Sequence, residues 1–357
     1  MKASPIQSSL NAGEFSPLTQ ARVRFDKYKN ALALCENFIP MVQGGVTRRT
    51  GTMFVNEVKD SSKFTRLIPF EFSVTQAYVI ELGETYFRFY KDRGQIVVSS
   101  VTAWLTGTAY VVGDVRSNAG TNYYCTTAHT SGTFATDLAA GKWYAMTGDI
   151  YEIPHTYALA DLPTVKFTQS ADVLYITHPK YAPRKLSRTG HTSWTLTEID
   201  FKDGPYLNTN VTSTTLTLSA TTGSVTVTAS ANLFASTDVG RLIRFKSGGT
   251  TWGYLKITAY SSATSVTADV KRAPNAATAS TDWRLGVWSG TTGYPSCVTF
   301  FEDRLFFAGA TKYPQRLDGS VAGDYENFAP SGDTGTVTDS SAVAITLNSS
   351  DVNVIRW

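Results

Sequence analysis

The side chains best suited to metal binding and proton transfer near neutral pH are histidines, and they are scattered along this chain. They are His129, His155, His178 and His191. No two of them have the spacing of an HxxxH or HExxH zinc site. We therefore predict no metal site.

Motifs for nucleophilic catalysis and phosphate binding are also missing from the sequence. It has no GxSxG elbow and no GxxxxGK[ST] loop, and Gly319-Ser320-Val321-Ala322-Gly323 places its serine next to the first glycine, which is the wrong position for an elbow. Carboxylates are plentiful, but a glycosidase pair is defined by distance in space. Asp161, Asp172 and Asp303 stand at expected strand entries, where aspartate commonly satisfies turn backbone. We predict no catalytic residue, no bound cofactor and no enzymatic activity.

One group of basic side chains is dense enough to contact phosphate or an acidic partner. It comprises Lys180, Arg184, Lys185 and Arg188. Four charges in a turn-rich segment of nine residues more often form a solvated face, which is the interpretation we favour. The whole chain has 32 Lys and Arg against 29 Asp and Glu, a formal net charge of +3. That charge is too small for a dedicated nucleic-acid binder.

The cysteines and the hydropathy of the sequence indicate the cellular compartment in which the chain folds. Cys35, Cys125 and Cys297 are odd in number and far apart, so they indicate no disulfide framework and favour folding in a reducing cytosol. Residues 1–10 lack the apolar region of a signal peptide, and no run approaches the roughly 18 apolar residues of a membrane span. We expect a protein that carries no export signal of its own and does not span a membrane.

Aromatic residues concentrate between residues 101 and 148. Their frame, W…Y…GD…Y…W, resembles the small chitin-binding modules of carbohydrate-binding families 5 and 12. Since flat rings stack on sugars, the resemblance makes four residues candidates for binding a host glycan: Trp104, Tyr110, Tyr124 and Trp143. The adjacent tryptophan pair of chitin-binding members is replaced here by Cys125-Thr126-Thr127-Ala128-His129. In so short a module the same rings can form the core instead, and we favour that role.

The rest of the chain indicates β-strands that must position these groups. Residues 64–91 alternate apolar and polar side chains and predict consecutive antiparallel strands, with Gly83-Glu84 in a type II′ hairpin turn. A similar unit recurs, in which a Phe precedes an apolar strand and then an Arg. The pairs are Phe72 and Arg88, Phe167 and Arg184, and Phe300 and Arg316. Without residues 101–148 and 207–286, the repeat is roughly 50 residues long, the length of a β-propeller blade. A divergent sandwich would give a similar pattern.

The second inserted stretch, residues 207–286, is rich in Thr, Ser and Ala and predicts a small all-β sandwich or barrel. Within it, Arg241 and Arg244 flank Leu242-Ile243. We expect a solvated strand edge there, with an interface anchor as the alternative.

At the N-terminus, Ser16 followed by Pro17 predicts a helix start. Apolar residues then recur at helical spacing and predict one helix face: Leu18, Ala21, Phe25, Tyr28, Leu32 and Cys35. We interpret residues 10–55 as an assembly element rather than a catalytic one.

The order of motifs resembles the tail nozzle family of short-tailed bacteriophages, also called tail tubular protein B or phage stabilisation protein. The motifs include Ser16-Pro17-Leu18, Asp26-Lys27-Tyr28, Cys35-Glu36-Asn37-Phe38-Ile39-Pro40, Asp203-Gly204-Pro205-Tyr206, Trp283-Arg284-Leu285-Gly286-Val287-Trp288, Asp303-Arg304-Leu305-Phe306-Phe307 and Gly323-Asp324-Tyr325. The resemblance implies a structural tail protein, assembled in the host cytoplasm, whose copies form a ring, six by analogy. It implies adaptor and tail-fibre proteins as partners and DNA passing through the lumen without specific binding.

Together these patterns predict a mainly β chain with β-propeller-like blades, a short N-terminal helix and two inserted small β domains. The expected divisions are an assembly element with the first blade (1–100), the carbohydrate-binding-like insertion (101–148), a second blade (149–206), the sandwich or barrel insertion (207–286) and a third blade (287–357). The alternative function is a host-surface glycan-binding or depolymerising tail protein.

Three units are fewer than the four to eight blades of a typical propeller. Ser340–Trp357 looks like one strand and the opening of another, so we expect an unpaired apolar strand at Val352–Trp357. The interpretation is either a longer gene product or a short propeller that a partner closes.

Overall fold

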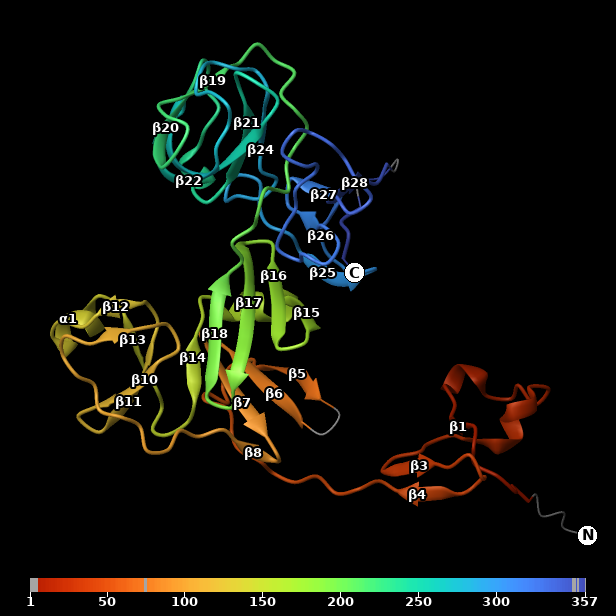
Figure 1. Cartoon of the computed structure of the whole chain (residues 1–357). Helices are drawn as coiled ribbons and strands as arrows, with labels where there is room; N and C mark the ends of the chain where they lie inside the picture. The colour runs from red at the N-terminus through yellow and green to blue at the C-terminus, as the bar shows by residue number, and fades with distance from the viewer. Residues whose placement is uncertain (1–5, 74–75, 349–350, 352, 357) are drawn as a thin grey trace, which may run out of the picture. The chain divides into compact units, whose positions relative to one another are not determined.

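The computed structural model of the chain describes residues 6–73, 76–348, 351 and 353–356. Two compact units divide the chain, Met1–Val55 and Asn56–Trp357. The larger unit consists mainly of β-strands joined by turns, which confirms the predicted mainly β class (Figure 1). The predicted strand at Val352–Trp357 includes two positions outside the described residues, and residues 353–356 are in no strand.

The N-terminal unit has only short elements. They are β1 (Gly13–Glu14), η1 (Pro17–Thr19), η2 (Asp26–Asn30), β2 (Ala31–Leu32), β3 (Phe38–Pro40) and β4 (Val46–Arg48), where η denotes a 3₁₀ helix. The predicted helix start is confirmed, because the Ser16 side chain accepts a hydrogen bond from the Leu18 amide with Pro17 at the first position. The prediction of one continuous helix face is wrong. Ala21 adopts a positive φ of 66° and Phe25 is extended, so the right-handed helix is broken between η1 and η2.

The larger unit begins with a meander of antiparallel strands. They are β5 (Arg66–Ser73), β6 (Gln76–Gly83) and β7 (Tyr86–Lys91), joined by β14 (Glu152–Pro154) and the short β8 (Gly94–Gln95). Ile68 and Phe70 are fully buried while Leu67 is exposed, so the predicted alternation is confirmed. The hairpin turn lies one residue later than predicted. Gly83 pairs with Tyr86, so Glu84 and Thr85 form the turn. The positive φ lies at the second of these residues, Thr85, whereas a type II′ turn has it at the first, so the predicted turn type is wrong.

Two further sheets repeat this chain order. The second sheet contains β15 (Lys166–Ser170), β16 (Val173–His178), β17 (Tyr181–Gly190) and β18 (Ser193–Glu198). The third sheet contains β25 (Cys297–Phe301), β26 (Arg304–Ala310), β27 (Tyr313–Gly319) and β28 (Val343–Thr346). In all three sheets the predicted Phe lies on the first strand and the predicted Arg on the third.

The repeat concerns strand order and not side-chain register. In the second sheet Phe167 opposes Ile176, which opposes Arg184. In the first sheet Arg88 opposes Glu81, which opposes Leu67 rather than Phe72. Equivalent sequence positions therefore occupy different environments in successive sheets.

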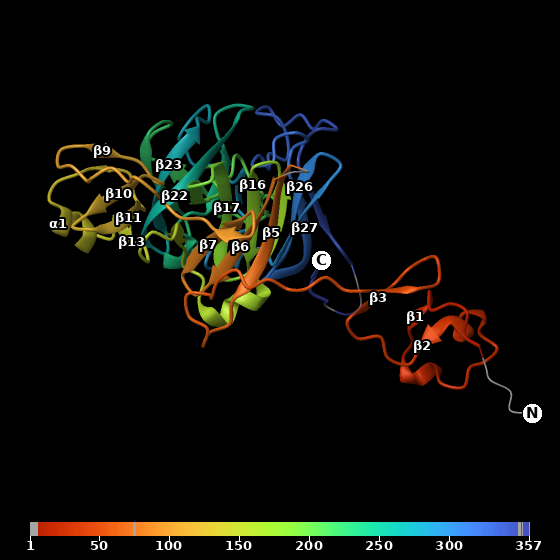
Figure 2. The ribbon, with the colours of Figure 1, turned by 90° about the horizontal axis from the view of Figure 1, so that it is seen from below.

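The second sheet packs between the other two (Figures 1 and 2). Trp194 of β18 is fully buried in the core that the first and second sheets share. Tyr175 of β16 lies instead in the core shared with Phe307 of the third sheet. Burial on both faces explains why β16 contains apolar residues at successive positions.

The first insertion is a small module with its own core. It contains β9 (Ala109–Tyr110), β10 (Val115–Asn118), β11 (Thr121–Cys125), β12 (His129–Thr130), α1 (Phe134–Ala139) and β13 (Trp143–Ala145). Val97 and Ile150 form an antiparallel bridge where the chain leaves and re-enters the first sheet. Both ends of the module are thus held side by side.

The second insertion is one six-stranded antiparallel sheet. Its strands are β19 (Leu216–Leu218), β20 (Ser224–Ala229), β21 (Leu242–Lys246), β22 (Trp252–Ser262), β23 (Ser265–Arg272) and β24 (Trp283–Leu285), in the order β19-β20-β23-β22-β21-β24. Leu216 also bridges Ser280, which brings the two edges together and curls the sheet around a buried core. The short 3₁₀ helices η3 (Leu159–Thr164) and η4 (Ser236–Asp238) complete the larger unit.

Candidate functional site

The four candidate glycan-binding residues do not form a common exposed platform. Tyr110 and Trp143 are buried together in the core of the module. Tyr124 is buried as well, and its hydroxyl donates a hydrogen bond of 3.0 Å to the Trp194 carbonyl, which ties the module to the first and second sheets. Trp104 is half-buried and meets Phe134 edge to face. Only Trp104 keeps ring surface that a sugar can reach.

Replacing Trp104 with alanine is expected to lower the free energy of unfolding by about 1–3 kcal/mol, less than for a fully buried aromatic residue. We expect retention on a polysaccharide column to stay at the wild-type level. Urea denaturation measures the free energy of unfolding, and chromatography of the same sample on the polysaccharide column measures retention. A variant of native stability that loses sugar retention would contradict the core role.

Two of the four histidines, His155 and His178, lie in the interior of the larger unit, whereas His191 is exposed and His129 is half-buried in the first insertion. His155 is buried, its Nε2–H donates to the Tyr86 carbonyl at 2.9 Å, and its Nδ1 accepts from the Tyr157 amide at 3.1 Å. Both ring nitrogens of the neutral tautomer are therefore occupied. Burial away from water lowers the pKa of His155 to about 3. Burial also lowers the pKa of His178.

These shifts predict that the protein loses stability in mild acid. Unfolded histidines bind a proton below about pH 6.5, whereas folded His155 stays neutral until about pH 3, so protonation favours the unfolded state within this window. We expect His155 to cost about 2 kcal/mol of unfolding free energy between pH 7.5 and pH 5. Urea midpoints across this range measure the slope. His155→Gln should reduce the slope, and an unchanged slope would contradict the assignment.

The basic group is largely neutralised by neighbouring carboxylates. Lys180 pairs with Asp161 at 2.6 Å, Arg184 with Glu198 at 3.4 Å and Arg188 with Asp172 at 2.9 Å. Lys185 pairs with Glu326. The solvated face predicted for this group is wrong for Arg188, whose side chain is only 8% exposed. These charges hold β17 to its surroundings and are not free to bind phosphate.

The predicted solvated strand edge at Arg241 and Arg244 is also wrong, because both arginines are buried. Arg241 pairs with Asp238 at 3.0 Å. Arg244 lies 3.4 Å from a carboxylate oxygen of Asp203 and donates to the Ser331 and Gly332 carbonyls. The alternative of an interface anchor fits better, with the interface inside the chain, between the second insertion and the segment after β27.

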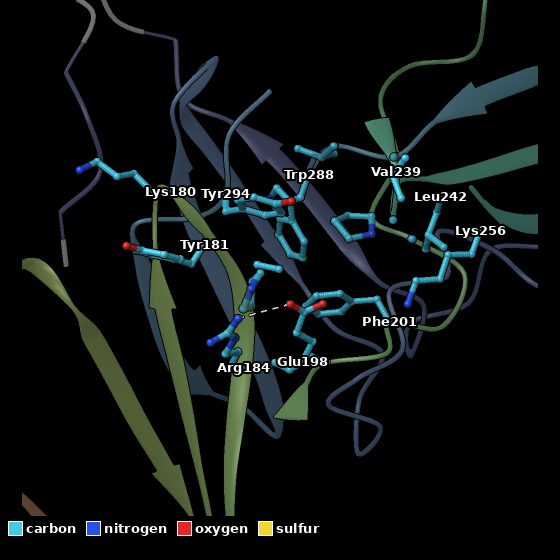
Figure 3. A pocket seen from close by; sticks show the side chains of 18 residues that line it. Lys180, Tyr181, Arg184, Glu198, Phe201, Val239, Leu242, Lys256, Trp288 and Tyr294 are labelled. Carbon is cyan, nitrogen blue, oxygen red and sulfur yellow. Dashed lines mark hydrogen bonds and ion pairs between the residues drawn. The ribbon is translucent and has the colours of Figure 1, made fainter. Parts of the chain in front are cut away.

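A cleft of about 350 Å³ lies where β17, β18 and the second insertion meet (Figure 3). Phe201, Trp288 and Tyr294 contribute aromatic surface to it. Among the described residues, neither the Trp288 indole N–H nor the Tyr294 hydroxyl has a hydrogen-bond partner. Glu198 is the one carboxylate lining the described cleft, so a glycosidase pair is not assembled there. Sequence reasoning found Trp288 only as part of a family motif.

The N-terminal unit exposes many apolar side chains. None of the described residues 6–55 is buried. Twelve large apolar side chains are exposed there: Ile6, Leu18, Val23, Phe25, Leu34, Phe38, Ile39, Met41, Val42, Met53, Phe54 and Val55. A hollow of about 530 Å³ remains open beside Phe15, Tyr28 and Leu32. A segment of this size without a buried core gains too little from apolar burial to offset the conformational entropy lost on folding. Its exposed apolar surface is therefore suited to binding a partner.

The described part of the chain contains no helix with the length and hydropathy that a membrane crossing requires. Its three cysteines are free thiols. Within the described residues, no three His, Cys, Asp or Glu side chains gather as metal ligands would. No protein-family model matches the chain, and no curated protein is significantly similar to it.

Proposed function

We propose that the protein is a structural subunit of the tail of a short-tailed bacteriophage, in which copies assemble into a nozzle ring and DNA leaves through the lumen. The observation that carries this proposal is the N-terminal unit, whose apolar side chains are exposed and whose described residues include no buried one. Surfaces of this kind are typical of interfaces that form on assembly.

The arrangement of the three sheets supports the same proposal. The second and third are four-strand antiparallel meanders in chain order, the first is the meander β5-β6-β7 extended by β14 and the short β8, and successive sheets pack through shared apolar cores. Successive meanders packed face to face are what a β-propeller-like body requires. The two insertions leave this body as separate small β modules with cores of their own.

The alternative function, a host-glycan binder or depolymerase, has weaker support. Tyr110, Tyr124 and Trp143 are buried, and Trp104 meets its neighbour Phe134 edge to face, so the four candidate rings do not form a flat sugar-stacking platform.

Mass photometry and negative-stain electron microscopy of the purified chain test the proposed function. We expect closed rings of uniform subunit number, with adaptor and fibre proteins of the same virion binding to them. A monomer at micromolar concentration that is retained by host polysaccharide would overturn the proposal in favour of the glycan binder.

A further inference from the structure

The N-terminal unit, here called the arm (residues 6–55), carries unpaired positive charge. Residues 1–55 contain seven Lys and Arg against three Asp and Glu. Six of the basic side chains are exposed in the described arm, and none of them forms an ion pair with a described residue: Arg22, Arg24, Lys27, Lys29, Arg48 and Arg49. The arm is thus both apolar and basic, which suits an apolar surface with acidic surroundings.

The segment that contains the third sheet has the opposite charge. Residues 287–357 contain eight Asp and Glu against four Lys and Arg. Glu302, Asp303 and Asp339 are exposed and belong to no ion pair among the described residues. Arg304 donates to the carbonyls of Asp339 and Ser341, which holds the loop after β27 beside the β25–β26 turn. The three carboxylates therefore gather at one end of the third sheet.

Apolar side chains are exposed beside this acidic end. Phe301 is 62% exposed and Val337 is 70% exposed. Strand β28 is the last strand of its sheet and pairs with β27 alone, and its Ile345 is 44% exposed. An exposed edge strand with apolar side chains is a surface to which another chain adds. Here the name "acceptor surface" denotes Phe301–Asp303, Val337–Asp339 and β28.

We propose that the arm of one copy packs on the acceptor surface of a second copy, joining the exposed apolar residues and pairing the basic arm with the acidic end. Residues 49–58 form no helix or strand, and ten extended residues reach about 33 Å. Such a contact joins two different surfaces, and repeated around an axis it closes a ring. The inference rests on the proposed ring and assigns the surfaces that form it.

Two substitutions that introduce a charge into the full chain test the contact: Phe38→Asp on the arm and Ile345→Asp on the acceptor surface. Each is expected to weaken assembly at least tenfold in mass photometry. The matched control is Val211→Asp, since Val211 is 96% exposed and lies outside both surfaces. Circular dichroism and urea midpoints verify that all three variants fold. The wild-type assembly should also weaken as salt rises, because the paired charges are exposed.

Cysteine crosslinking decides which copy the arm contacts. In a Cys35→Ser background, copies carrying Phe38→Cys are mixed with copies carrying Ile345→Cys and oxidised. Disulfide-linked dimers are expected, whereas Val211→Cys should give none. If the mixture stays monomeric while the double variant closes a disulfide within one chain, the arm folds back on its own copy and the inference is wrong. If wild-type rings persist in both Asp variants, the contact is wrong but the ring stands. Wild-type monomers would refute the ring itself.

Discussion

Replacing Trp194 with alanine is expected to lower the free energy of unfolding by about 3–5 kcal/mol, the cost of deleting a large buried aromatic side chain. Trp194 is fully buried, and the centroid of its ring lies 4.8 Å from that of Phe70 and 4.4 Å from that of Phe89. Its backbone N–H also donates a hydrogen bond to the Tyr151 hydroxyl at 2.9 Å. The residue joins the first and second sheets, so both should lose stability together.

Urea denaturation followed by far-ultraviolet circular dichroism measures this loss. The control is Tyr260→Ala, which removes an aromatic ring that is 38% exposed and should cost about 1 kcal/mol or less. Equal losses in the two variants would show that Trp194 does not hold the sheets together.

The second large effect is expected at Asp203, whose carboxylate is buried beside two arginines. It accepts a hydrogen bond from Tyr206 at 2.9 Å, lies 3.4 Å from Arg244 and pairs with Arg272. Asp203→Asn keeps the shape and tolerates the positive φ of 40°, but it leaves the Arg244 charge buried without its counter-charge. We expect a loss of about 3–5 kcal/mol in unfolding free energy.

The matched control is the same substitution at Asp200, which is 70% exposed and pairs with Lys256. Asp200→Asn should cost about 1 kcal/mol or less, since an exposed ion pair contributes little. Adding Arg244→Met to Asp203→Asn removes the unpaired charge and should recover part of the loss. Equal costs at Asp203 and Asp200, measured as urea midpoints, would contradict the role of the buried pair.

The strands were predictable because their signal is local. Ile68 and Phe70 alternate with exposed neighbours, and each predicted Phe or Arg of the repeat lies on the expected strand. Local spacing was less informative at the N-terminus. The apolar period there is compatible with a helix, but it does not report the left-handed backbone at Ala21 that ends the first turn.

Burial of charge was not predictable, since it depends on contacts between distant residues. Arg244 is buried because Asp203 and Ser331 approach it, and they lie 41 and 87 positions away in the sequence. The same limit applies to Tyr124, whose hydroxyl partner Trp194 is 70 residues further on. The residue type of Tyr124 indicated a ring that could stack on a sugar, whereas its contact with Trp194 makes the ring part of the core. The assembly role proposed for residues 10–55 stays a prediction that the exposed arm supports.

The place of the first insertion has a consequence for biosynthesis. Strand β14 completes the first sheet by pairing with β7, yet 60 residues separate Lys91 from Glu152. As the chain leaves the ribosome, the module between them has mostly local contacts and can fold before β14 is synthesised. Once folded, it holds Val97 beside Ile150, so β14 emerges next to its partner strand. The folded module then replaces a long flexible loop with a short closed one, which lowers the entropy cost of adding the last strand.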